Sequence, residues 1–220
     1  MPPRLRLLIG LASLHTALLI TSTVAGAKLV ALPFGLSASA TVLSYALTFV
    51  ILDTIADLYG ADVSAFVINM GLAGMMLAAV YLAAAAVVPP APGFAGQEAF
   101  SIVLSSSWRI WLAGWCAYTV SQRLDVWIYL ALKRTGIVGQ AVVTRAGVSL
   151  TIGQFVDTAL FVTVAFVGKT PLLPVILGQY AVKLALACVA VPLVGVTVAV
   201  ARRLVAGDEA TTRAGAAACS

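Results

Sequence analysis

Charged and amide side chains recur inside long apolar stretches of this chain. Gln154 and Asp157 lie near the middle of residues 148–168, "VSLTIGQFVDTALFVTVAFVG". A carboxylate at the centre of a membrane-spanning helix costs about 2.5–3.5 kcal/mol on insertion scales. A residue this costly indicates a function, a compensating partner on another segment, or both.

Three other apolar segments carry polar residues at helical spacing. Asp53 and Asp57 are four residues apart in "LDTIADLYG" and share a helix face. Gln122 and Asp125 lie on one stripe of "YTVSQRLDVWIY", together with the Tyr at each end of that segment. Lys183 follows Gln179 by four residues in "GQYAVKLAL". Polar side chains that are costly to bury in a membrane therefore occur in several spans rather than in one.

One short pattern occurs twice. Residues 121–129, "SQRLDVWIY", and residues 153–161, "GQFVDTALF", both read small–Gln–x–x–Asp. If these segments are adjacent antiparallel helices, their Gln and Asp side chains point towards one cavity. Inverted pseudo-symmetry would explain the match, and so would chance over nine residues. In the span that contains residues 153–161, Ser149 shares the face of Asp157, and Arg145 lies where the helix begins.

This set of side chains suits a planar polar ligand better than a bare ion. A carboxylate can accept two parallel hydrogen bonds, and Gln offers a donor and an acceptor together. Aromatic side chains that could stack on a ring include Tyr45, Tyr129 and Phe161. From the residues alone, the sequence predicts a small-solute membrane transporter with a polar site near the midplane.

The composition is that of an all-α integral membrane protein. Of 220 residues, 62% are hydrophobic and 10% are charged, against about 25% charged in soluble domains. The net charge of +5 does not indicate nucleic-acid binding, because the basic residues lie mostly at the ends of apolar spans. A single His and three unpaired-looking Cys predict no metal site and no cofactor.

The apolar blocks are long enough to cross about 30 Å of hydrocarbon as helices. We expect about six, covering roughly residues 7–30, 37–58, 63–88, 108–132, 147–167 and 172–201. The "FSIVL" segment in the loop after the third block predicts a short interfacial helix. These spans form one transmembrane domain, residues 1–204, and the polar residues 205–220 predict a disordered cytoplasmic tail.

Lys and Arg residues predict that both termini are cytoplasmic. In that orientation the cytoplasmic segments hold Arg4, Arg6, Lys133, Arg134, Arg145, Arg202, Arg203 and Arg213. The opposite side holds only Arg109, Lys169 and Lys28. The first span has no A-x-A cleavage pattern after its basic start, which favours a retained helix over a signal peptide.

Several of these residues also have purely structural interpretations. Asp57 could be solvated at its helix end, and Lys28 could extend to the membrane interface. Arg123 and Asp125 could form an internal ion pair. Asp157 could pair with Lys183 to hold two helices together without binding any ligand. Each alternative predicts a different partner for the residue in the structure.

Four segments together resemble the queuosine precursor transporter family, within the vitamin uptake transporters. "LTFVILDTIADLYGADVSA" is similar to its acidic segment, D-x-x-x-E/D-x-Y/F-G. "AYTVSQRLDVWIYLALKR" and "TRAGVSLTIGQFVDTALFVTVAFVG" resemble its paired Q-x-x-D segments. "YAVKLALACVAVPLVGV" resembles its last helix, with a central Lys and a Pro. The chain departs from the family at Ser22 and Thr23, where an Asn is common, and at Asp57, where many members have Glu.

The resemblance implies uptake of the cyano and aminomethyl 7-deazaguanine precursors of queuosine across the bacterial inner membrane, for modification of tRNA. The substrate-binding positions that it implies are Asp53, Gln122, Asp125, Arg145, Ser149, Gln154, Asp157 and Lys183. We expect Asp157 or Asp125 to accept the N1–H and the exocyclic amine, while Gln122 and Gln154 contact the remaining edge. Without ligand, Asp157 would pair with Lys183 or take up a proton.

Rival functions make different predictions. A substrate-binding subunit of an energy-coupling-factor vitamin importer would also have about six helices, and would need a separate ATPase and coupling subunit. An intramembrane enzyme would need a nucleophile or a metal, for which the sequence has no motif. A structural scaffold would tolerate loss of both Asp125 and Asp157. The Gly- and Ala-rich third span could support a homodimer.

Overall fold

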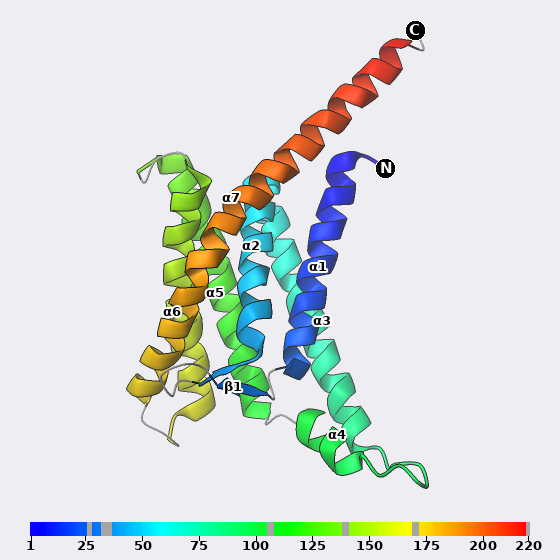
Figure 1. Ribbon diagram of the computed structural model, residues 1–220, viewed down its shortest axis with the longest axis vertical. Coiled ribbons are helices and arrows are strands. Elements are labelled where there is room, and N and C mark those ends of the chain that lie inside the picture. The colour runs from blue at the N-terminus through cyan, green and yellow to red at the C-terminus, as the bar shows by residue number, and fades with distance from the viewer. Residues whose placement is uncertain (26–27, 32–36, 105–107, 138–140, 169–171, 219–220) are drawn as a thin grey trace.

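Six long helices form a bundle, and a seventh, short helix lies beside one end of it (Figure 1), within the residues that the structure describes. The computed structural model describes residues 1–25, 28–31, 37–104, 108–137, 141–168 and 172–218. The long helices are α1 (Pro3–Ala25), α2 (Thr41–Tyr59), α3 (Ala61–Val87), α5 (Trp108–Thr135), α6 (Val142–Phe166) and α7 (Leu172–Ala218). The short helix, α4 (Gln97–Leu104), contains the "FSIVL" segment, which confirms that a helix forms there.

The bundle confirms the all-α membrane class. Helices α1, α3, α6 and α7 each contain a segment long and apolar enough to cross a membrane. The other two long helices, α2 and α5, carry Asp53, Asp57, Arg123 and Asp125 within their length. Both termini lie at the same end of the bundle (Figure 1), as an even number of crossings requires. Six crossings and cytoplasmic termini stay predictions.

Helix α2 occupies the centre of the fold. Every residue from Thr48 to Asp57 is buried, on all faces of the helix. Helices α1, α3, α5 and α7 all pack against α2. A helix buried all round is normally apolar all round, yet this stretch includes the fully buried Asp53. The central position of α2 therefore brings its two carboxylates into contact with the other helices rather than with lipid.

The connection between α1 and α2 differs from the prediction. Helix α1 ends at Ala25 rather than near residue 30, and α2 begins at Thr41 rather than 37. Strands β1 (Leu29–Ala31) and β2 (Ser37–Ser39) pair antiparallel between them, with Leu29 opposite Ser39. The backbone N–H of Ala40 also donates to the carbonyl of Lys28, at 2.9 Å. Pairing of the strands satisfies backbone groups that the predicted helix ends would have left without partners.

Helix α7 is the longest element and has two features of consequence. Pro192 lies inside it, and because proline has no backbone N–H, it cannot donate the usual helical hydrogen bond. The helix also continues to Ala218, across residues for which we predict a disordered tail. The Ala-rich sequence of that segment explains the helical backbone, because Ala has the highest helix propensity. The division of the chain at residue 204 stays a prediction.

Gly71 of α3 packs tightly against side chains of α1 and α5. A Cβ atom on Gly71 would lie 2.7 Å from both Leu19 Cδ1 and the Tyr118 hydroxyl. Both side chains are fully buried, so Gly71→Ala should destabilise the bundle by about 1–3 kcal/mol through overpacking. Gly114→Ala, with nothing within 4 Å of the new methyl, is the matched control. Thermal unfolding in detergent measures both, and equal midpoints would contradict this packing.

Candidate functional site

The two small–Gln–x–x–Asp segments pack against each other, and the small residue of each contacts the Asp of the other. The Ser121 hydroxyl on α5 donates to Asp157 Oδ1 on α6, at 3.1 Å. Conversely, a Cβ atom on Gly153 would lie 3.1 Å from Asp125 Cβ. The helices are thus antiparallel with a reciprocal register. This arrangement brings Asp125 and Asp157 into the same interface, as the repeated pattern predicts.

Asp157 pairs with the cation that the sequence offered for it. Lys183 Nζ on α7 lies 2.5 Å from Asp157 Oδ2. The lysine side chain is 14% exposed and that of Asp157 is 6% exposed, so the pair is largely shielded from solvent. With the Ser121 hydroxyl on its other oxygen, the carboxylate has a partner for each oxygen. This pairing offsets the cost of a carboxylate inside an apolar helix.

Asp53 and Asp125 have no such compensation. Both side chains are fully buried and lie against each other, with the Ser149 hydroxyl beside Asp125. Among the described residues, none of their four carboxylate oxygens has a hydrogen-bond partner of good geometry. The side-chain carbonyls of Gln122 and Gln154 are likewise buried without a donor. The interior between α2, α5 and α6 therefore contains several acceptor oxygens and too few donors to satisfy them.

Aromatic and hydroxyl groups of α1, α2 and α5 adjoin these acceptors. Gln122 Nε2 donates to Thr48 Oγ1 at 3.3 Å. The Tyr45 ring lies edge-on to the Tyr118 ring, with centroids 6.5 Å apart, and Tyr45 is close enough to Asp157 to feel its charge. His15 Nε2 lies 3.0 Å from the Tyr118 hydroxyl. Tyr45 is thus a ring near the Asp157–Lys183 pair, as a stacking site requires.

A second charged group lies at the end of the bundle that holds the termini. Asp57 on α2 forms ion pairs with Lys133 of α5, Arg145 of α6 and Arg202 of α7. The separations from Lys133 and Arg145 are 2.9 and 3.3 Å. We call these four residues the Asp57 cluster. It connects four helices through one carboxylate.

The Asp57 cluster decides between interpretations that the sequence left open. Asp57 is buried and paired rather than solvated at its helix end. Arg145 points to this cluster, with its guanidinium 5.3 Å from the centre of the Tyr129 ring, and not to Asp157. Tyr129 itself donates to Asp57 Oδ1 at 3.3 Å. Of the predicted site residues, Arg145 therefore lies farthest towards the terminal end.

Of the structural interpretations that remain, the one for Arg123 is wrong and the one for Lys28 stays a prediction. Arg123 donates to Asn69 Oδ1 at 2.6 Å and its residue is exposed, so the predicted pair between Arg123 and Asp125 is wrong. Residues two apart in a helix point in different directions, which explains why the two do not meet. Lys28 is exposed beside β1, beyond the end of α1, and its role at an interface stays a prediction.

The residues of this site lie in the part of the chain that is similar to known proteins. The family described as "putative vitamin uptake transporter" matches residues 39–197. The chain belongs to this family of vitamin uptake transporters. It is also 26% identical over 162 residues to the "probable queuosine precursor transporter" of Bacillus subtilis (strain 168), covering 72% of this chain and 71% of that protein. No solved structure matches the chain.

The family match confirms the resemblance found in the sequence. It extends from β2 into α7 and includes all eight predicted substrate-binding residues, while Arg202 lies just outside it. The chain is therefore a transporter, and it is a multi-pass protein of the bacterial inner membrane.

Sequence reasoning missed several members of the transporter's polar interior. In the sequence, Lys133 and Arg202 indicate only the membrane orientation, although both pair with Asp57 in the structure. Ser121 carried a signal that could have found it, because it is the small residue of the first repeated segment. Thr48 carried none, since a Thr five residues before Asp53 is unremarkable before its contact with Gln122 is known.

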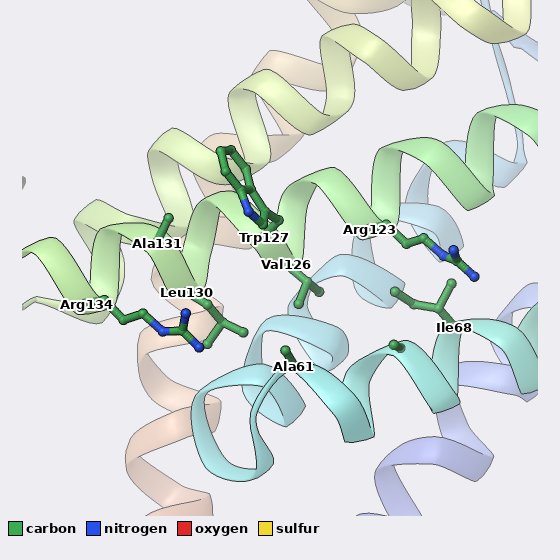
Figure 2. Close-up of a pocket in the computed structure, with 9 residues that line it drawn as sticks. Ala61, Ile68, Arg123, Val126, Trp127, Leu130, Ala131 and Arg134 are labelled. Atoms are coloured by element: carbon green, nitrogen blue, oxygen red, sulfur yellow. The ribbon is translucent and has the colours of Figure 1, made fainter.

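A surface groove of the transporter lies apart from these residues. Figure 2 shows it between α3 and α5, with Arg123 and Arg134 along α5 and the Trp127 ring on its outer side. Its volume is about 200 Å³. None of the eight predicted site residues lines it. The predicted site residues lie instead in the interior between α2, α5, α6 and α7.

Gly153→Ala should impair the transporter by displacing Asp125. The new methyl would lie 3.1 Å from Asp125 Cβ and 3.3 Å from Asp125 Oδ1, so the fully buried carboxyl must shift by a few tenths of an ångström. We expect a severalfold loss of uptake and a cost of about 1–3 kcal/mol in unfolding free energy. Gly147→Ala, in the same helix with an ordinary 3.7 Å contact to Val191, should retain both. Equal uptake in the two variants would contradict the close packing.

Proposed function

We propose that this transporter imports queuosine precursors, namely 7-cyano-7-deazaguanine, 7-aminomethyl-7-deazaguanine or both, for queuosine synthesis in tRNA. The name of the Bacillus relative supports this substrate class. The observation that carries the proposal is the excess of buried acceptor oxygens on Gln122, Asp125, Gln154 and Asp53. The proposed activity is transport without a catalytic step.

A ligand rich in N–H donors would satisfy this interior. Buried acceptors without donors cost about 1–3 kcal/mol each, so a bound molecule that supplies donors recovers that free energy. A 7-deazaguanine presents N1–H and an exocyclic amine on one edge, which a single carboxylate can accept bidentately. The site thus favours a planar donor-bearing base over a ligand that carries acceptors alone.

Each predicted residue has a place in this binding mode. Asp157, or Asp125 across the interface, accepts the N1–H and amine pair. Gln122 and Gln154 contact the remaining edge of the base. Lys183 holds Asp157 when no ligand is bound, at 2.5 Å, and is displaced when the base arrives. The Tyr45 ring is the aromatic group placed to stack on it.

The other three residues act around this core. Asp53 and Ser149 adjoin Asp125, so they determine its charge and orientation. Arg145 lies in the Asp57 cluster and closes the polar interior at the terminal end. An aminomethyl substituent is cationic, and the carboxyls of Asp53 and Asp125 favour it over the neutral cyano group. A homodimer packed through α3, together with contacts to membrane lipids, completes the proposed set of partners.

Thermal unfolding of the detergent-purified protein tests this function. A ligand that binds only the folded form stabilises it by about 2.7 kcal/mol at roughly a hundred times its dissociation constant. We expect a raised midpoint with the two 7-deazaguanines, a smaller one or none with guanine, and none with biotin. Stabilisation by a vitamin instead would reject the substrate, although it would fit the family description.

An energy-coupling-factor importer is the alternative that the vitamin uptake family raises. In that case the chain would bind substrate and depend on a separate ATPase and coupling subunit. Affinity purification from native membranes would then recover those subunits in stoichiometric amounts. Uptake by proteoliposomes that contain this chain alone would exclude the alternative.

A further inference from the structure

The carboxyls of Asp53 and Asp125 form a buried pair. Both residues have no solvent exposure and their side chains adjoin. Within the part of the chain that the structure describes, no hydrogen bond of good geometry reaches any of the four oxygens. Asp125 also packs closely against Gly153, where an added Cβ atom would lie 3.1 Å from Asp125 Cβ. Two ionised carboxylates in this arrangement would repel each other in a region shielded from solvent.

The charged groups around the pair are engaged elsewhere. On the terminal side, the Asp57 carboxylate binds Lys133, Arg145 and Arg202, and the Tyr129 hydroxyl also bonds to Asp57. On the other side, Lys183 of α7 pairs with Asp157 of α6. From α1, His15 bonds to Tyr118, and on α3 Asp62 is exposed.

One positive charge nevertheless acts on the pair. Arg145 attracts Asp53, although Asp125 and Asp57 repel it more strongly, and its hydrogen bond goes to Asp57. The Asp57 cluster as a whole has three cations around one carboxylate, and this excess of positive charge can offset one ionised carboxyl of the two. The second carboxyl has no counter-charge among the described residues, and a proton held between the two carboxyls would both remove its charge and supply a hydrogen bond.

We propose that Asp53 and Asp125 share one proton and that this pair couples import to proton entry. The pair lies between the Asp157–Lys183 ion pair and the Asp57 cluster. Asp125 is one helical turn from Ser121, which bonds to Asp157, and Asp53 is one turn from Asp57. Loading the proton therefore changes the charge next to both the substrate site and the Asp57 cluster. This coupling rests on the proposed transport of deazaguanines.

The first experiment uses proteoliposomes of the wild-type chain with 7-cyano-7-deazaguanine, because this substrate carries no charge of its own. A gradient of one pH unit, acidic outside, should support about tenfold accumulation if one proton enters with each molecule, since both ratios represent the same free energy. A trapped pH dye should report internal acidification upon addition of the substrate. Accumulation driven by a sodium gradient, or equilibration without accumulation, would overturn the proposal.

The second experiment detects the shared proton without any substrate. Infrared spectroscopy of the membrane-reconstituted protein at neutral pH should show the C=O band of a protonated carboxyl. That band should disappear in both Asp53→Asn and Asp125→Asn and should persist in Asp62→Asn, which alters an exposed carboxyl. A wild-type spectrum without the band would overturn the shared proton even if deazaguanines are transported.

The two experiments separate the inference from the proposed function. If no deazaguanine binds or enters, the proposed function fails while the infrared band still reports on the pair. If Asp53→Asn loses both the infrared band and the accumulation along a pH gradient, while Asp62→Asn keeps both, coupling through the pair is supported. If Asp53→Asn accumulates the cyano base tenfold like the wild type, the pair does not carry the coupling proton.

Discussion

Asp157→Asn is expected to abolish uptake of the deazaguanines while the protein still inserts and folds. The substitution keeps the size of the side chain and removes the charge that accepts two parallel N–H donors. It also leaves Lys183, only 14% exposed, without its counter-charge. Breaking a buried pair in this way costs about 3–5 kcal/mol. Uptake into cells and thermal unfolding of the purified variant measure the two effects separately.

The control for this experiment separates binding from stability. In Asp157→Asn combined with Lys183→Met, both charges are gone, so the unfolding midpoint should recover. Uptake should stay absent, since the carboxylate is still missing. Asp62→Asn, at an exposed carboxyl, should behave as wild type in both assays. Normal uptake by the single variant would exclude Asp157 from the substrate site.

Asp57→Ala is expected to have the largest effect on stability. It removes the carboxylate that connects α2 to α5, α6 and α7 and leaves Arg145, with a 3% exposed side chain, unpaired. The pairs with Lys133 and Arg202 contribute less, since their side chains are 34% and 53% exposed and solvent screens them. We expect a loss of about 3–5 kcal/mol, or roughly 6–20 °C in unfolding midpoint for a chain of this size.

The cations of the Asp57 cluster provide the matched comparison. Arg145→Met should destabilise the protein more than Arg202→Met, because only Arg145 is fully buried. Raising the salt concentration should weaken the contribution of Arg202 and leave that of Arg145 nearly unchanged. Thermal unfolding at low and high salt measures both. If Arg202→Met were the more damaging change at every salt concentration, the assignment of the central pair to Arg145 would be wrong.

The partner of Asp157 was predictable, and the partners of Asp57 were not. A carboxylate near a membrane midplane has few cations within reach, and Lys183 is the only Lys well inside another apolar span. Asp57 lies near a helix end, where several basic residues are available and the sequence does not show which helix ends converge. Arg202 and Lys133 became its partners because α5 and α7 both meet α2 there.

The reciprocal register of α5 and α6 was predicted only in outline. The repeated segments indicated that two Gln and Asp sets could converge. They did not indicate that Ser121 bonds to Asp157 while Gly153 contacts Asp125, because register depends on packing along the whole interface. The hairpin of β1 and β2 left no signal at all, since strands of three residues have no readable alternation.

Pro192 gives α7 a point of low bending stiffness between its two cations. Lys183 and Arg202 lie 19 residues apart on this helix, or about 28 Å at the rise of an α-helix. The missing backbone hydrogen bond at Pro192 means that a bend there breaks no further bond. One half of α7 can therefore swing with Lys183 while the other half stays anchored to Asp57. Helix α7 thus has a flexible point between two segments, one bound to Asp157 through Lys183 and the other bound to Asp57 through Arg202.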